Sequence, residues 1–244
     1  MKLSFVIPAY NEEKYIRKCL ESVVKQTSKW SDIEIIVVNN ASSDKTKEIA
    51  LSFTGVKVVD EPKKGLVRAR QAGYKASTGE LIANIDADAE VPDDWIKKIY
   101  DKFSADKNIV ALSGPYIFYD LPPLINFSTK IFYGLGYVIH RAIHFIFRKG
   151  GMIQGGNFVL RRDALDKAGG FNVDEIEFYG EDTDIALRMQ KVGKILFSFD
   201  FKMYTSGRRL SKEGVLTMGL RYAINHFWTL VFKKPYTKDY IDIR

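Results

Sequence analysis

The chain has 244 residues, of which 46% are hydrophobic and 13% are aromatic, so it can bury a sizeable core and does not have the composition of a disordered protein. Its formal net charge of +7 and its pI near 9.2 favour an anionic partner, but charge alone does not choose between a nucleic acid, a nucleotide and an anionic membrane surface. Its single cysteine, Cys19, excludes an intrachain disulfide and suits a reducing compartment.

The first half of the chain alternates between short apolar runs and amphipathic segments. Strands are predicted at 3–7, 33–38, 56–59 and 81–85, with helices between them. Asn11 is a candidate N-cap of the first of these helices. This alternation with short connections is typical of a doubly wound, mostly parallel sheet. The glycine fingerprint of dinucleotide-binding proteins and the Walker sequence are both missing, which disfavours a dehydrogenase or a P-loop enzyme.

The second half begins with a helix at about 92–104 and a strand near 109–113. It then carries an aromatic helix at 124–147, strands at 158–160 and 194–199, and a final amphipathic helix at about 212–232. Charged residues interrupt the aromatic helix, so it is predicted either to lie in a membrane interface or to pack as a core or subunit helix. His140 and His144 on that helix are interpreted as packed or interfacial rather than metal-binding.

Two carboxylates mark the end of the strand at 81–85. Asp86 and Asp88 are one residue apart, and in an extended segment both would point to the same side. Ligands of open α/β sheets bind at the carboxyl ends of the strands. The sequence therefore predicts a cation site at this position.

Several short motifs occur in an order that resembles family 2 glycosyltransferases of the GT-A fold. The resemblance covers about residues 2–200, and its landmarks are 6–12, 37–44, 65–70, 85–88, 155–157, 169–171 and 180–184. It implies a Rossmann-like, mostly parallel central sheet flanked by helices, with amphipathic helical additions. It also divides the chain into a glycosyltransferase domain at 1–210, with a nucleotide-binding half at 1–113 and an acceptor half at 114–210, and a C-terminal amphipathic helix and tail at 211–244.

The resemblance implies a nucleotide site and a metal site in the first half of the chain. The nucleotide contacts are Pro8, Tyr10, Glu12, Asn39, Asn40, Arg68, Arg70 and Asp86, although either arginine could instead belong to a solvated helix face. Asn39 and Asn40 replace aspartates that are usual in the family, so a uracil base is favoured while guanine stays open. Asp88 would bind Mn²⁺ or Mg²⁺, with Asp86 beside it, and the cation would stabilise the departing nucleoside diphosphate.

The catalytic groups implied by the resemblance lie in the second half. Asp182 matches the general base and Glu181 would orient it or touch the acceptor. Gly155, Gly156 and Asn157 match the loop that borders the donor sugar and the acceptor. Arg208 and Arg209 would contact the diphosphate or form a solvated or membrane-facing basic patch. The Gln-x-x-Arg-Trp sequence of processive relatives is absent, which favours transfer of a single sugar.

These expectations describe an inverting, metal-dependent hexosyltransferase that moves one sugar from a nucleotide-diphosphate sugar to a hydroxyl acceptor, such as a membrane lipid or a lipid-linked glycan of the cell envelope. One alternative is a polyprenyl- or dolichyl-phosphate sugar transferase using GDP-mannose or UDP-glucose, and another is a non-catalytic nucleotide-sugar binding protein. No nucleic-acid motif is found. Without a signal peptide or an apolar run of about 18 residues, the expected location is the cytoplasm, including peripherally the inner face of the membrane.

Overall fold

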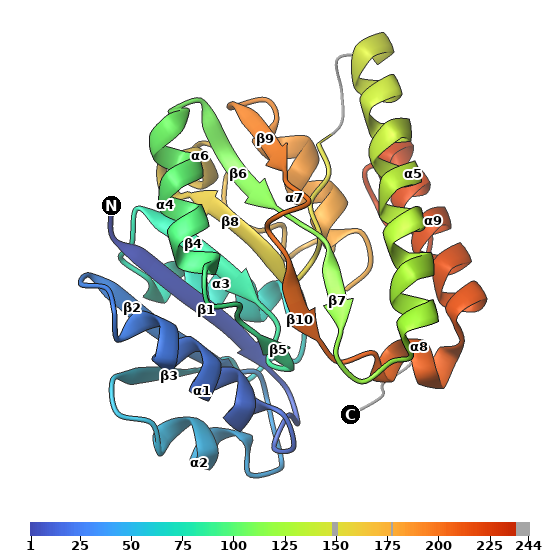
Figure 1. The fold of residues 1–244 in the computed structure, drawn as a ribbon. Coiled ribbons are helices and arrows are strands. Elements are labelled where there is room, and N and C mark those ends of the chain that lie inside the picture. The colour runs from blue at the N-terminus through green and yellow to red at the C-terminus, as the bar shows by residue number, and fades with distance from the viewer. Residues whose placement is uncertain (148–150, 177, 238–244) are drawn as a thin grey trace.

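A mostly parallel β-sheet forms the centre of the fold (Figure 1). The computed structural model describes residues 1–147, 151–176 and 178–237. Within these ranges seven strands make up the central sheet, in the order β3-β2-β1-β4-β8-β6-β9. Strand β8 is antiparallel to both of its neighbours, and the other paired strands are parallel. The strands are β1 Leu3–Ala9, β2 Ile33–Asn39, β3 Val56–Asp60, β4 Leu81–Ile85, β6 Ile109–Ser113, β8 Asn157–Arg161 and β9 Lys194–Phe197.

Helices cover both faces of this sheet and give the molecule three layers. On one face α1 (Ile16–Thr27), α2 (Thr46–Leu51) and α4 (Trp95–Ala105) pack against Phe5 and Ile7 of β1. On the other face α3 (Leu66–Ala76), α6 (Arg162–Lys167) and α7 (Glu181–Met189) share a second hydrophobic core with Val6. Because successive side chains of a strand point to opposite faces, β1 contributes to both hydrophobic cores.

A second, smaller sheet lies beside the carboxyl end of β4. It consists of β5 (Ala89–Glu90), β10 (Met203–Thr205) and β7 (Tyr116–Phe118), with β10 in the middle. Its strands come from three distant parts of the chain. The small sheet therefore brings the segment after Ile85 next to the segment before Arg208.

Two long helices lie side by side outside the central sheet, at the right of Figure 1. They are α5 (Pro123–Phe147) and α9 (Val215–Phe232), which follows the short helix α8 (Arg208–Glu213). Many apolar side chains on both helices are exposed. Within the described residues, none of the helices combines the length and the apolar character that crossing a bilayer requires.

The predicted fold class is confirmed, and the predicted strands of the central sheet agree with the observed ones within a few residues. Two local expectations were wrong. The helix expected at about 212–232 is two helices separated at Gly214, whose φ of +81° is incompatible with a continuing helix. Asn11 does not cap α1, which begins at Ile16; it has a φ of +51° and accepts a hydrogen bond from Ser43 N instead. The helix expected at about 92–104 is present as α4, Trp95–Ala105.

Candidate active site

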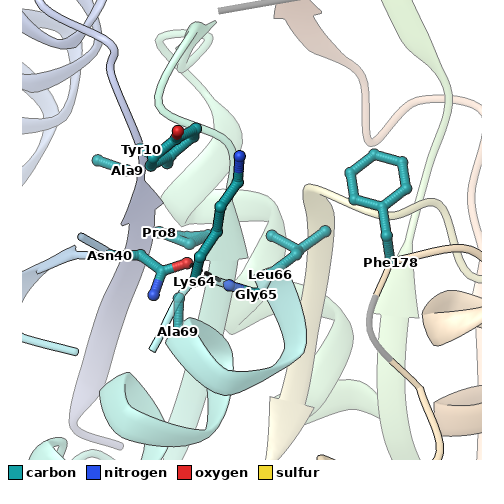
Figure 2. Close-up of a pocket in the computed structure, with 9 residues that line it drawn as sticks. All are labelled: Pro8, Ala9, Tyr10, Asn40, Lys64, Gly65, Leu66, Ala69 and Phe178. Atoms are coloured by element: carbon teal, nitrogen blue, oxygen red, sulfur yellow. Dashed lines mark hydrogen bonds between the residues drawn. The ribbon is translucent and has the colours of Figure 1, made fainter. Parts of the chain in front are cut away.

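A pocket opens where β1 and β2 end and α3 begins. It is lined by Pro8, Ala9, Tyr10, Asn40, Lys64, Gly65, Leu66, Ala69 and Phe178, shown in Figure 2. The Lys64 ammonium lies 4.0 Å from the centre of the Tyr10 ring. An aromatic ring and a cation side by side suit a flat base and an anionic group. The sequence analysis did not single out Lys64, although its position next to Gly65 before a helix was a usable signal.

The two asparagines at the end of β2 stabilise the walls of this pocket. Asn40 donates from Nδ2 to the carbonyl oxygens of Glu61 and Lys63, and its Oδ1 accepts a hydrogen bond of 2.8 Å from Gly65 N. Asn39 donates to Asp60. Although Asn40 lines the pocket, its amide is engaged in holding the loop before α3, so it is a weaker candidate for reading a base than its sequence position suggested.

Arg208 joins the nucleotide side of the site to Asp88. Its Nη2 atom lies 2.5 Å from Glu12 Oε1 and 3.0 Å from Asp88 Oδ2. Its guanidinium group also lies over the ring of Tyr15, 4.4 Å from the ring centre. Asp88 in addition accepts a hydrogen bond from Thr205 of β10. The small sheet therefore places Arg208 next to Asp88, the predicted metal ligand. The spacing of these residues in the sequence could not show this contact.

Asp86 belongs to a second ionic group. Arg70, which is 1% exposed, lies 3.3 Å from Asp86 Oδ1 and 3.2 Å from Glu181 Oε1, so one buried cation joins the ends of β4 and the start of α7. The hydroxyl of Tyr116 donates to Asp86 Oδ2 at 3.0 Å. Burial and the charge of Asp86 raise the pKa of Tyr116, so this hydroxyl stays protonated. Tyr116 is a site residue that the sequence analysis missed.

The stretch from Asp86 to Asp88 is a turn rather than the extended segment expected from the sequence. Ala89 N donates to the carbonyl oxygen of Asp86 and closes the turn. As a result the two carboxylates have different partners, Arg70 for Asp86 and Arg208 for Asp88. The pair keeps its expected place at the carboxyl end of β4.

The glycine loop before β8 separates the predicted metal ligands from the predicted base. Gly156 has a φ of +79°, and a Cβ there would lie 2.1 Å from Asp86 Oδ2. A Cβ on Gly155 would lie 3.0 Å from Glu181 Oε1 and 3.9 Å from Asp182 Oδ2. Gly156 therefore requires a residue without a side chain, because of both its backbone and its contacts. At Gly155 a side chain would fit only if Glu181 moved by a few tenths of an ångström.

Asn157, grouped with these glycines in the sequence analysis, lies in the core. It is 0% exposed, its Oδ1 accepts a hydrogen bond from Trp95 Nε1, and its Nδ2 donates to the carbonyl oxygens of Gly114 and Phe201. All of the hydrogen-bonding capacity of the amide nitrogen is used within the protein. Asn157 thus stabilises the fold behind the glycine loop.

Glu181 and Asp182 begin α7 with different environments. Burial, despite the charge of Arg70, raises the pKa of Glu181 to about 7. Asp182 is only half-buried, and burial raises its pKa while hydrogen bonds from Thr183 oppose the change. Asp182 Oδ1 accepts from Thr183 N at 2.7 Å. Asp182 is therefore the more accessible of the two carboxylates, and its Oδ2 atom is the one near Gly155.

The remaining predicted arginines lie at the edges of the site. Arg68 is half-buried in the first turn of α3, with its aliphatic chain next to Gly65 of the pocket. Arg209 forms an ion pair with Glu213 at 2.9 Å and lies over the ring of Phe178, another pocket residue. Both are close to pocket-lining residues, whereas Arg70 and Arg208 lie between carboxylates.

The donor chemistry around β4 fits a hard divalent cation. Within the described ranges no cluster of three or more His, Cys, Asp or Glu side chains is arranged to hold a metal ion. Of the predicted site residues, Asp86 and Asp88 at the end of β4 would be the protein ligands, and phosphate oxygens and water would complete the shell. The carboxylate of Asp88 has several lone pairs, but Arg208 already lies against its Oδ2, so a cation would have to share Asp88 or displace the arginine.

The pocket and the acidic pair lie at the carboxyl ends of the strands, where open α/β sheets bind their ligands. The sequence profile described as Glycosyl transferase family 2 matches residues 4–169, more than half of the chain. The chain belongs to this family of glycosyltransferases. The matched region includes Asp86, Asp88 and the glycine loop and ends before Glu181.

Comparisons with individual proteins agree with this assignment. The chain is 31% identical over 136 residues to the glycosyltransferase GlyA of Streptococcus pneumoniae, a match that covers 54% of this chain and only 18% of GlyA. The mannosyltransferase PcManGT of Pyrobaculum calidifontis, solved with GDP-Man and Mn²⁺, has the same fold, with a TM-score of 0.71, 20% identity, and coverage of 95% of this chain and 64% of that one. The glucosyl-3-phosphoglycerate synthase of Mycobacterium tuberculosis, solved with Mn²⁺, UDP and phosphoglyceric acid, also has this fold. Its TM-score is 0.65 and its identity 19%, and the match covers 95% of this chain and 78% of that one.

Proposed function

We propose that this chain transfers a single sugar, with inversion, from a nucleotide-diphosphate sugar to a hydroxyl acceptor, with the help of a divalent cation. The observation that carries the proposal is that three acidic side chains from two parts of the fold lie against one glycine loop. Asp86 lies against Gly156, and Glu181 and Asp182 lie against Gly155. A donor whose diphosphate lies near Asp86 and Asp88 would thus have its sugar near Asp182.

The nucleotide end of the donor fits the pocket in Figure 2. Tyr10 offers a ring for stacking, and Lys64 a cation near the phosphates. The preference for a uridine nucleotide rested on the amides of Asn39 and Asn40, and the Asn40 amide is engaged within the loop. We keep a UDP-sugar as the first candidate donor and GDP-mannose as the second.

Asp86 and Asp88 would hold Mn²⁺ or Mg²⁺. A bound cation would supply positive charge that stabilises the departing nucleoside diphosphate. Arg208 and Arg70 are the chain's own cations at the same position, each paired with one of the two aspartates. Guanidinium groups bind phosphate oxygens well, so Arg208 would contribute directly to binding the diphosphate, while the buried Arg70 would hold Asp86 in place.

Asp182 would act as the general base. It is partly exposed, and its Oδ2 atom lies near the glycine loop, where the acceptor hydroxyl would attack. Burial raises the pKa of Asp182, which makes the carboxylate a better proton acceptor than an exposed aspartate. Attack from this side, opposite the diphosphate, inverts the anomeric centre in one step.

The acceptor side of the site is bordered by α7 and α9, and we propose that α5 and α9 lie on an anionic membrane surface that carries a lipid or lipid-linked acceptor. Neither helix contains Asp or Glu. Exposed apolar side chains recur every three or four residues along α5, and they are Leu124, Phe127, Ile131, Leu135 and Val138. An apolar stripe without acidic residues in a chain of net charge +7 complements an anionic bilayer.

Flotation with vesicles tests this membrane proposal. We expect the protein to float with vesicles of phosphatidylglycerol and phosphatidylcholine and to float less with phosphatidylcholine alone. A variant with Leu124, Ile131 and Leu135 changed to Ser should lose binding without loss of fold, since all three side chains are more than half exposed. Absence of binding to either kind of vesicle would refute the membrane proposal and leave the transferase proposal intact.

Thermal unfolding with UDP, GDP, UDP-glucose and GDP-mannose, each with Mn²⁺, Mg²⁺ or a chelator, tests the donor and the metal together. We expect one nucleotide series to stabilise the protein only when the metal is present, by about 2.7 kcal/mol at a hundred times its Kd. The Asp88→Asn variant should lose the part of this stabilisation that depends on the metal. Stabilisation that does not depend on metal would argue against Asp88 as a ligand, and no stabilisation by any nucleotide would contradict the proposal as a whole.

A further inference from the structure

A chain of hydrogen bonds runs from the start of α7 to the two outer helices. The hydroxyl of Thr183 lies 3.3 Å from Asp182 Oδ1 and 2.8 Å from His226 Nδ1. The Nε2 atoms of His226 and His140 are 3.1 Å apart. Three helices distant in the sequence, α7, α9 and α5, are thus connected through polar atoms to the proposed base.

The residues of these hydrogen bonds are mostly removed from water, with Thr183 and His140 buried and His226 partly buried. Thr183 is 3% exposed and His140 is 9% exposed, and the rings of His140 and His226 lie with their centres 5.1 Å apart. Burial lowers the pKa of both histidines to about 4, and their mutual repulsion contributes for His140. Both rings are therefore neutral at neutral pH, and each carries one N–H.

Neutral rings allow only two arrangements of the hydrogen bond between the Nε2 atoms, because one ring must donate and the other accept. If His226 donates from Nε2, its Nδ1 is bare and takes the Thr183 proton, and His140 must bury an N–H at Nδ1. If His140 donates from Nε2, His226 carries its proton on Nδ1 and donates it to Thr183, whose hydroxyl can then donate to Asp182.

His140 Nδ1 decides between these arrangements. It is buried and has no hydrogen-bond partner within the described part of the chain. A buried N–H without an acceptor is rarer and less favourable than a buried lone pair without a donor. The second arrangement is therefore favoured, and every hydrogen bond in it points toward Asp182.

We propose that His140, His226 and Thr183 form a directed relay of positioning residues that holds Asp182 Oδ1 and leaves Oδ2 facing Gly155. The proposal rests on the assignment of Asp182 as the base. The hydroxyl of Thr183 adds to the bond from Thr183 N, so Oδ1 has two donors from one residue. Through this relay, helices α5 and α9 support the active site from one side, while the membrane proposal concerns their exposed faces.

Histidine-selective ¹⁵N labelling tests the relay without any substrate, since the chain has only three histidines. Long-range ¹H–¹⁵N spectra at neutral pH identify the tautomer of each ring. We expect His226 protonated at Nδ1 and His140 at Nε2, with a shift of the His226 Nδ1 resonance in Thr183→Val. His226 protonated at Nε2 alone would overturn the direction of the relay, because Thr183 would then donate to the histidine and not to Asp182.

Steady-state kinetics test the positioning role. The reaction measured is hydrolysis, in the presence of Mn²⁺, of whichever donor binds in the thermal-unfolding screen, UDP-glucose or GDP-mannose. Thr183→Val keeps the shape of the side chain and removes the hydroxyl, and we expect kcat to fall about tenfold with KM for the donor unchanged. Thr183→Ser should restore most of the rate. His226→Asn, which can still donate near the position of Nδ1, should retain more activity than His226→Leu.

The pH profile separates positioning from general stability. Loss of the Thr183 hydroxyl removes a donor to the ionised carboxylate, so the acid limb of kcat should move to higher pH in Thr183→Val and return in Thr183→Ser. Thr129→Val, which loses a hydroxyl that bonds only within α5, is the matched control and should not move the profile. An unchanged profile in Thr183→Val would refute the relay even if the variant is less stable. If no donor is hydrolysed, the proposed function fails while the tautomer test still decides the relay.

Discussion

Arg208 Nη2 lies 3.0 Å from Asp88 Oδ2, so an arginine occupies part of the position that the sequence predicts for a metal ion. The same guanidinium group also contacts Glu12, which is 2% exposed. Two carboxylates from the nucleotide and metal sides of the site are thus neutralised by one internal cation. Arg208 thus supplies, at these two carboxylates, positive charge of the kind that a metal ion would also bring.

Arg208→Ala should therefore make the protein less stable and more responsive to metal. Removing the guanidinium from two mostly buried carboxylates is expected to cost about 3 kcal/mol in the free energy of unfolding. Mn²⁺ should restore part of this loss and stabilise the variant more than the wild type, in denaturant unfolding with and without the ion. The matched control is Arg209→Ala, because Arg209 contacts Glu213 instead. An equal response to Mn²⁺ in Arg208→Ala and wild type would refute the competition between arginine and metal.

Asp182→Asn should abolish most of the turnover and leave nucleotide binding intact. General base catalysis contributes about a hundredfold or more, and the amide is nearly isosteric with the carboxylate. Glu181→Gln should act differently: Glu181 is buried against Arg70 and its pKa is raised to about 7, so the variant should lose stability more than turnover. The checks are donor turnover and the thermal shift with nucleotide and metal. Full turnover in Asp182→Asn would favour an acceptor that is already ionised, such as a lipid phosphate.

The central sheet could be predicted from the sequence because its strands are apolar runs with clear ends. The strand at 81–85 ends where Asp86 begins, and the run at 109–113 ends at Gly114. The small sheet could not be predicted. Its strands have two or three residues and no measurable periodicity, and they pair only because the finished fold brings 89–90, 116–118 and 203–205 together.

The sequence predicts the types and positions of several candidate site residues better than it predicts what those residues contact. Asp86, Asp88 and Asp182 have the expected positions at element ends, since these positions follow from the order of strands and helices. Asn157 looked like a loop residue because it follows two glycines, but its amide is bonded in the core. His140 has His226 as its neighbour, a residue 86 positions away that no helical spacing indicates.

Tyr10→Ala should weaken nucleotide binding, whereas Tyr10→Phe should not. The ring lines the pocket, and loss of a stacking surface is expected to cost about 1 kcal/mol, or about fivefold in Kd. Lys64→Ala should weaken binding of nucleotide diphosphates more than binding of the nucleoside alone, because its role is electrostatic. Lys63→Ala is the control, since Lys63 is exposed and does not line the pocket. Calorimetric titration with UDP and GDP measures these effects, and equal weakening by Lys63→Ala would show a general charge effect.

Acid should destabilise the fold through the histidine pair. The pKa of His140 and of His226 is lowered to about 4 by burial, from an ordinary value of 6.5. Between these values the unfolded chain binds protons that the folded chain does not, so stability falls as the pH drops from 6.5 toward 4. Glu181, whose pKa is raised to about 7, contributes in the opposite direction, because the folded state then holds the extra proton.

Comparison with a variant isolates the contribution of the pair from that of Glu181. A double change of His140 and His226 to Asn removes both titrating rings and keeps Glu181, so its stability should fall less between pH 6.5 and 4.5 than that of the wild type. Urea unfolding at pH 6.5, 5.5 and 4.5 provides the measurement, and the nearby carboxylate of Asp182 is present in both proteins. Parallel curves for the two proteins would mean that the rings titrate as they do in the unfolded chain, and the buried neutral pair that the relay requires would be excluded.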